Sequence, residues 1–266
     1  MLQLNKDNYF SLQADQEYMS CSQFQGFQKC EAKQMAKLAG EWVDEKSTAL
    51  LVGSYVHSWN EGIEAKREFI TNTPEMFTKT GLKAEFKVAD RMIEVLEQDE
   101  FCMHMLRGQK EVIVTAEMFG MWWKVRFDNY LPEEKFASDL KTTKSITEKD
   151  WVVRDGVNAK VSFVEAYDYL IRAAVYCEVE RLATGREEGD WLNFYIVAVS
   201  KEDPPDKAVI SLKDPFRYSL ELEKIKESLL RIKLLKQGIL RPIRCGKCNY
   251  CRSTKRVEGV LDYRDM

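Results

Sequence analysis

Two aspartates and a lysine occur close together in residues 122–144, around a short break that contains Pro and Glu. Apolar and aromatic runs flank this break, a pattern typical of a β-hairpin. If residues 132–135 form the loop, strand pairing places Asp128 opposite Asp139. Directly opposed side chains have Cβ atoms roughly 4.5–5.5 Å apart, so these two carboxylates could share a divalent cation.

The lysine of this stretch follows the second aspartate by two residues. Lys141 and Asp139 should therefore lie on one face of the strand, while Leu140 points the other way into a core. Two carboxylates and an ammonium on one face suit phosphodiester hydrolysis, because Mg²⁺ can polarise the phosphate and activate water while the ammonium offsets developing charge. The same spacing also occurs in ordinary solvated ion pairs, so the choice between these two interpretations depends on the rest of the chain.

A second group of reactive residues lies near the other end of the sequence. Three of the seven cysteines form C-x-x-C-x-x-C: Cys245, Cys248 and Cys251. The surrounding segment is basic and poor core material, which indicates a three-thiolate clamp that lacks one ligand. Cys30 and Cys21 could supply the fourth thiolate, whereas Cys102 and Cys177 look helical and buried. Four thiolates suit Zn²⁺ or a [4Fe–4S] cluster equally well.

The charge distribution allows a nucleic-acid partner without requiring one. The net charge is −3, but residues 239–256 contain six basic side chains and no acid: Arg241, Arg244, Lys247, Arg252, Lys255 and Arg256. A local basic patch of this kind can hold phosphates even on an acidic protein. A solvated tail is the alternative interpretation.

Composition favours one compact, soluble unit over residues 1–266, with 45% hydrophobic and 31% charged residues. No apolar run approaches the ~18 residues of a membrane span. The first residues have no basic region leading into an apolar run, so we expect no signal peptide. A cytoplasmic location follows as an expectation, and reduced thiols with it.

Two of the helices expected before the hairpin contain candidate site residues. Residues 18–40 begin with Ser20 and Gln23 at capping-box spacing and contain Cys30. Residues 48–61 contain His57, one of only two histidines. The buried side of this second helix should consist of Leu50, Val52 and Val56.

The periodicity then changes to that of strands. Residues 111–117, 121–130 and 135–142 predict an antiparallel meander. A helix over 161–184 should follow, with an inner face made of Tyr167, Leu170, Ile171, Ala174 and Val175.

Residues 192–200 form an apolar run typical of a strand buried on both faces, reached by a crossover. Residues 206–212 could add an edge strand, and residues 216–237 should form a last amphipathic helix. A further helix or helix pair is expected earlier in the chain, over residues 80–107. This order predicts an α/β (α+β) fold with a mixed central sheet flanked by helices.

These segments together resemble the RecB-type branch of the PD-(D/E)XK nucleases, and most closely the phage RecE-like exodeoxyribonucleases related to exonuclease VIII. The resemblance rests on GSYVHSWNEG, VRFDNY, SDLKT and YDYLIRAAVY in this order, between SQFQGFQKCEA and RCGKCNYCRSTK. It implies a restriction-endonuclease-like core over nearly the full length.

The resemblance also implies roles for particular residues. His57 matches the histidine that helps to hold metal, and Asp128 and Asp139 match the carboxylates that bind Mg²⁺ or Mn²⁺. Lys141 matches the lysine that orients the attacking water or stabilises the transition state. We count these four residues as the expected catalytic set.

Contacts with DNA are expected elsewhere. The helix after the sheet in such nucleases usually carries Gln-x-x-x-Tyr, and here Tyr176 is present while Arg172 stands in place of Gln. Arginine at a phosphate-facing position is chemically reasonable. The other expected DNA-contacting residues are Lys144, Arg244, Lys247 and Arg252.

Related nucleases with an iron–sulfur staple use one cysteine before the nuclease core and three after it. Cys30 with the three clustered cysteines copies that layout, although the last gap is shorter than usual. On this resemblance a [4Fe–4S] cluster is preferred over Zn²⁺.

The resemblance implies a Mg²⁺-dependent exonuclease that digests linear double-stranded DNA ends, 5′ to 3′, for phage or prophage recombination in a bacterial host. A ring-shaped homo-oligomer and a single-strand annealing partner belong to the same expectation. A non-catalytic DNA-binding or assembly module and a structure-specific endonuclease are the alternatives.

Overall fold

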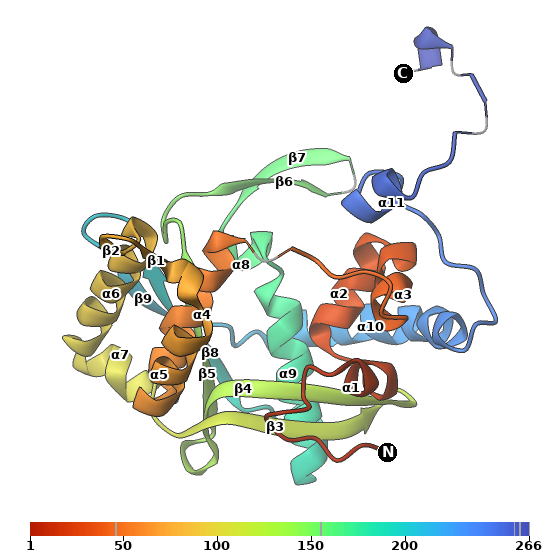
Figure 1. The fold of residues 1–266 in the computed structure, drawn as a ribbon. Coiled ribbons are helices and arrows are strands. Elements are labelled where there is room, and N and C mark those ends of the chain that lie inside the picture. Colours follow the sequence, from red (N-terminus) through yellow and green to blue (C-terminus); the bar gives the residue numbers. More distant parts are fainter. Residues whose placement is uncertain (46, 155, 258, 261, 266) are drawn as a thin grey trace.

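The computed structural model describes residues 1–45, 47–154, 156–257, 259–260 and 262–265. Its centre is a five-stranded sheet in the order β3-β4-β5-β8-β9 (Figure 1). The strands are β3 (Gln109–Met118), β4 (Met121–Leu131), β5 (Phe136–Thr143), β8 (Asn193–Ser200) and β9 (Lys207–Ser211). Only the β5–β8 pair is parallel among these. The expected mixed sheet is therefore confirmed.

The hairpin between β4 and β5 has the predicted register. Asn129 pairs with Ser138 and Leu131 with Phe136, around the short 3₁₀ turn η2 (Pro132–Glu134). Leu140 is fully buried, on the opposite face from the neighbouring acid, as alternation requires. The predicted meander and strand β8 with its parallel return are also present.

Helices cover both faces of the sheet. One face packs against α4 (Thr48–Glu61), α5 (Ile63–Asn72), α6 (Ala84–Glu97) and α7 (Glu100–Met105). A two-stranded ribbon, β1 (Phe77–Thr78) and β2 (Gly81–Leu82), precedes α6. Helices α6 and α7 are the pair in the segment predicted over 80–107. The other face packs against α2 (Cys21–Lys29), α9 (Tyr169–Thr184) and α10 (Pro215–Lys236).

The helix predicted over 18–40 is two helices, α2 and α3 (Glu31–Leu38). They meet at Cys30, whose extended backbone has φ −168° and ψ 105°. The Cys30 N–H closes α2 by donating to the carbonyl of Gly26, and the Cys30 sulfur caps α3 by accepting from the Lys33 N–H. Ser20 caps α2 as predicted, but the Gln23 side chain donates to other backbone carbonyls and does not complete the capping box.

The helix predicted over 161–184 is also broken. It consists of α8 (Phe163–Ala166) and α9, separated by Asp168 in the left-handed conformation at φ 54°. Tyr167 stands at this break and is 60% exposed, so its predicted place in the core was wrong. The predicted burial of Leu50 was also wrong. Leu50 lies in the first turn of α4, lines a cleft, and is 57% exposed.

Some elements had no predicted counterpart. The hairpin of β6 (Asp150–Arg154) and β7 (Val157–Val161) follows β5 and precedes α8 in the chain, and it projects away from the central sheet (Figure 1). The short helix α1 (Leu12–Glu17) lies near the start of the chain. Near its other end, the short helix α11 (Asn249–Ser253) is followed by the 3₁₀ turn η3 (Tyr263–Asp265). None of the described helices is both long and apolar enough to cross a membrane.

Candidate active site and cysteine cluster

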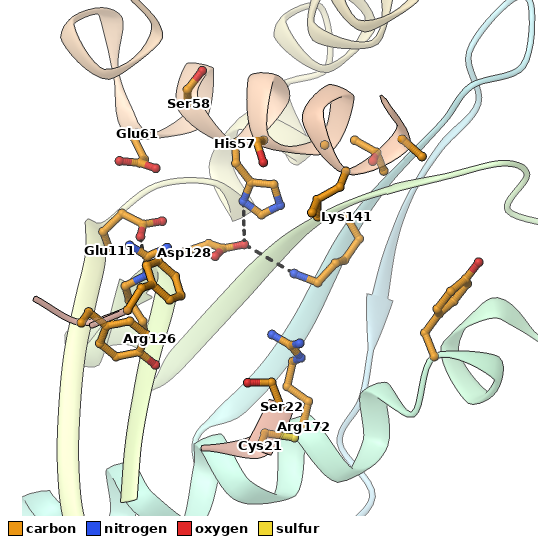
Figure 2. A pocket seen from close by; sticks show the side chains of 18 of the residues that line it. Cys21, Ser22, His57, Ser58, Glu61, Glu111, Arg126, Asp128, Lys141 and Arg172 are labelled. Atoms are coloured by element: carbon orange, nitrogen blue, oxygen red, sulfur yellow. Dashed lines mark ion pairs between the residues drawn. The ribbon is translucent and has the colours of Figure 1, made fainter. Parts of the chain in front are cut away.

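The two aspartates and the lysine of the hairpin converge beside a cleft of about 1180 Å³, which Asp128 and Lys141 line while the buried Asp139 lies outside its lining. The amine of Lys141 lies 2.9 Å from Oδ2 of Asp139 and 3.7 Å from Oδ2 of Asp128. Figure 2 shows the Lys141 amine beside the Asp128 carboxylate. The convergence follows from the hairpin register, because neighbouring strands bring same-face side chains together.

His57 approaches the same carboxylate from helix α4. Its Nδ1 lies 3.4 Å from Oδ2 of Asp128 (Figure 2). Gly53, one turn earlier, lets the helix come close to strand β5: a Cβ there would lie 3.4 Å from Oγ1 of Thr142. Burial lowers the pKa of His57, more than the nearby Asp128 raises it. A neutral imidazole results, which is the form that ligates metal.

Charge balance keeps the carboxylate and the amine ionised. Burial alone would raise the pKa of Asp128, but the charge of Lys141 and a 2.9 Å hydrogen bond from the Leu140 N–H hold it below its usual range. Burial alone would lower the pKa of Lys141, yet Asp139 and Asp128 raise it. An ionised carboxylate facing a protonated amine is the arrangement that metal-assisted hydrolysis needs.

The donor set fits a hard divalent cation. The Asp139 side chain is 2% exposed, and its Oδ2 accepts no hydrogen bond of regular geometry from the described residues, despite the nearby Lys141 amine. A buried carboxylate oxygen without a full set of donors is unfavourable unless another positive group completes it. Carboxylates from adjacent strands, with a neutral imidazole beside them, can supply oxygen and nitrogen ligands to Mg²⁺ or Mn²⁺.

Arg172 is the predicted DNA-contacting residue closest to this site. Its guanidinium lies 4.0 Å from Oδ2 of Asp139 and 5.8 Å from the centre of the Tyr176 ring. Tyr176 itself is only 7% exposed and packs edge-on against Phe127. Tyr176 also lines the cleft, next to Arg172, and its contact with DNA stays a prediction.

Of the remaining predicted DNA-contacting residues, Lys144 lies at the cleft and the three tail residues do not. Lys144 lines the cleft, where its amine pairs with Glu148 at 2.8 Å. The three tail residues belong to the neighbourhood of the cysteines: Arg244 donates to the Cys251 carbonyl, Arg252 donates to Asn249, and Lys247 lies between the clustered cysteines. These three residues lie outside the lining of the cleft.

Sequence analysis missed an acid–arginine pair beside the aspartates. Glu111 has a left-handed backbone with φ 55° inside strand β3, and its buried Oε2 lies 2.7 Å from Nε of Arg126. Burial raises the pKa of Glu111 to about 7. The pairs on either side, Lys110 with Asn129 and Val112 with Phe127, place it across from Asp128. A strand pattern alone gives no sign of the left-handed residue.

The four cysteines predicted as a clamp are brought together. All four sulfurs lie within 4.8 Å of one another, with Cys30 and Cys251 3.6 Å apart. Backbone N–H groups of Cys248 and Lys247 hold the pKa of the Cys245 thiol down, to about 6, which favours a thiolate. Cys21 lines the cleft instead, so Cys30 supplies the fourth sulfur. This donor set could bind a metal.

A mixed sheet that presents two carboxylates and a lysine from adjacent central strands defines the PD-(D/E)XK class. The profile of the PDDEXK-like domain of unknown function matches residues 20–254. The chain belongs to this family and has its nuclease-like fold.

A solved structure is similar over the whole chain. The crystal structure named "Putative exonuclease" from Eubacterium rectale is 38% identical, with a TM-score of 0.90, covering 100% of this chain and 98% of its own. A second solved structure, SSO0001, is 13% identical over 82% of this chain and 90% of its own, and its TM-score of 0.30 is too low to compare folds. No curated protein is significantly similar to this chain.

Proposed function

We propose that this protein is a metal-dependent nuclease that hydrolyses phosphodiester bonds of DNA in the cleft beside β4 and β5. The observation that carries the proposal is the convergence of Lys141 on Asp128 and Asp139, with one aspartate oxygen lacking regular donors. Membership of the PDDEXK-like family and similarity to a protein named as an exonuclease support it.

Each residue has a chemical role in this proposal. Asp128 and Asp139, with the neutral His57 beside them, would hold Mg²⁺ or Mn²⁺, which supplies Lewis acidity and lowers the pKa of water. Lys141 offsets the negative charge that develops on the phosphate oxygens. Arg172 lies near the carboxylate of Asp139 and can hold a phosphate on the side of the site formed by α9.

Exonuclease action is the finer part of the proposal. We assign linear double-stranded DNA ends as the substrate, 5′ to 3′ polarity, and a role in phage or prophage recombination in the bacterial cytoplasm. These assignments rest on the RecE-like resemblance and on the named relative. The same resemblance supports a ring-shaped homo-oligomer and a single-strand annealing partner.

The catalytic assignment predicts that Asp139→Asn and Lys141→Met each lower the rate of Mg²⁺-dependent degradation of linear duplex by at least about a hundredfold. The reason is that one removes a metal ligand and the other a compensating charge. Degradation of end-labelled DNA, timed beside a covalently closed circle, measures both the rate and the need for an end.

Two surface variants control for nonspecific effects. Asp203→Asn removes an acid that pairs with Arg91 on the surface, and Lys226→Met removes a solvated amine on α10. Both should degrade DNA like the parent. Normal degradation by both active-site variants would end the nuclease assignment, and equal cleavage of the closed circle would replace the exonuclease with an endonuclease.

For the cysteine cluster we propose a single tetrahedral ion such as Zn²⁺. Four thiolates at about 2.3 Å from one zinc lie about 3.8 Å from each other, and two of the sulfur–sulfur distances here are 3.6 and 3.9 Å. In a [4Fe–4S] cluster each thiolate ligates a different iron, so the sulfurs lie considerably further apart. The spacing thus favours zinc over the iron–sulfur cluster preferred from the resemblance.

A further inference from the structure

Two exposed aromatic rings on the lining of the cleft have no role in the proposed hydrolysis. Phe10 is 69% exposed and Tyr167 is 60% exposed, and both line the same cleft as Asp128 and Lys141. Single exposed rings are common on protein surfaces, but two of them that line one polar cleft are in position to contact a ligand bound there.

The Phe10 ring is held in place from behind. The guanidinium of Arg126 lies 4.5 Å from the centre of the Phe10 ring and 5.3 Å from that of Tyr9. Arg126 is fixed in turn by buried Glu111 at 2.7 Å. Tyr9 is anchored because Lys124 donates to its carbonyl at 2.5 Å. A supported ring of this kind keeps one face free for a flat partner.

The Tyr167 ring is supported on the other side of the cleft. It stacks on Tyr169 with ring centres 6.0 Å apart and an angle of 29° between planes. The ring of Tyr169 lies 5.9 Å from the amine of Lys141. Figure 2 shows Arg126 and Lys141 on opposite sides of Asp128, so the two aromatic supports flank the carboxylates.

We propose that Phe10 and Tyr167 are stacking platforms for the bases of an unpaired strand on either side of the scissile phosphate, an inference that rests on the proposed nuclease function. Aromatic platforms beside phosphate-binding groups are the chemistry by which proteins hold single strands of any sequence.

Binding of oligothymidylate tests this inference without hydrolysis, in protein that carries Asp139→Asn. Phe10→Ala and Tyr167→Ala should each weaken binding by about five- to a hundredfold, as expected when one base–aromatic stack is lost. Phe10→Trp and Tyr167→Phe keep a flat ring and should bind like the parent. Fluorescence anisotropy of the labelled strand measures each dissociation constant.

Two controls isolate stacking from other effects. Phe216→Ala removes a ring that is 75% exposed on α10, outside the cleft lining, and should change nothing. An abasic strand of equal length should bind the parent and the two alanine variants equally, because it has phosphates but no bases. The assignment of Phe10 and Tyr167 as stacking platforms would be overturned if both alanine variants bound oligothymidylate as tightly as the parent, or if the parent did not bind it. Degradation of duplex by the wild-type protein would meanwhile leave the nuclease assignment standing.

Discussion

Glu111 is the residue whose surroundings least resemble those of an ordinary strand. It combines a left-handed backbone at φ 55°, a buried carboxylate and an ion pair with Arg126. A non-glycine residue in that conformation costs roughly 1–2 kcal/mol, and burial of the charge adds to the cost. Such costs are typical of functional sites, where position matters more than stability. Here the position supports the Arg126–Phe10 stack next to Asp128.

The raised pKa of Glu111 predicts how stability depends on pH. Burial lifts the folded-state pKa of Glu111 from 4.5 to about 7. The contribution of protonated Glu111 to the free energy of unfolding is therefore present below pH 4.5 and is lost as the pH rises through 7. Glu111→Gln should therefore gain stability relative to wild type across that interval, by up to about 3 kcal/mol. Urea unfolding at several pH values measures the difference. Glu117→Gln, which removes an exposed acid from the same strand, is the control for the loss of one carboxylate. A difference for Glu111→Gln that does not change with pH would refute the assignment.

At the scale of elements, the site depends on how the start of β3 packs against the end of β4. Gly108 leads into β3 with φ 95°, and a Cβ there would lie 2.5 Å from the carbonyl of Tyr130. Only glycine can satisfy both conditions. The close approach aligns β3 with the end of β4, and this alignment places Glu111 across from Asp128.

Two glycine substitutions separate backbone strain from close packing. Gly108→Ala and Gly120→Ala both place a side chain at positive φ, but a Cβ at Gly120 would meet nothing within 4 Å. Both should lose stability through the strained backbone, and Gly108→Ala should lose at least about 1 kcal/mol more because its Cβ meets a carbonyl. The midpoints of urea unfolding give the comparison. Equal losses would mean that β3 and β4 move apart easily.

At the scale of the whole molecule, the cysteine cluster joins segments from the two ends of the chain. Cys30 lies between α2 and α3, and Cys251 lies in α11. The N-terminus of α2 lines the cleft through Ser20, Cys21 and Ser22, so the cluster also anchors one wall of the site. A metal ion at this point would close a loop that contains the entire sheet, which stabilises a fold by restricting the unfolded chain.

Purified protein is expected to contain one zinc per chain and to be colourless. Chelation, or Cys248→Ser, should remove the metal and make the segment after α10 sensitive to protease, because the tail loses its attachment to Cys30. Metal analysis and limited proteolysis measure these outcomes, and Asp139→Asn should keep its zinc. A brown protein with iron and inorganic sulfide would restore the iron–sulfur assignment. Intact resistance to protease without metal would show that the cluster does not hold the tail.

Local patterns were sufficient to predict the hairpin and the catalytic candidates. Turn residues at 132–135 and alternating strands determine the register, and the register alone brings Asp128 next to Lys141. The spacing of three cysteines likewise predicted a clamp, because ligand spacing within a short segment is a local property. The α4 boundaries, Thr48–Glu61, also agree with the predicted range.

Only the tertiary structure decided what depends on residues far apart in sequence. The break at Cys30, the exposure of Tyr167 and the left-handed Glu111 all override local helix or strand patterns. The choice of Cys30 over Cys21 as the fourth sulfur required the whole fold. Periodicity reports which face of an element is apolar, but it carries no information on which distant element packs there. A pairing such as Phe10 on Arg126 is therefore determined by long-range packing.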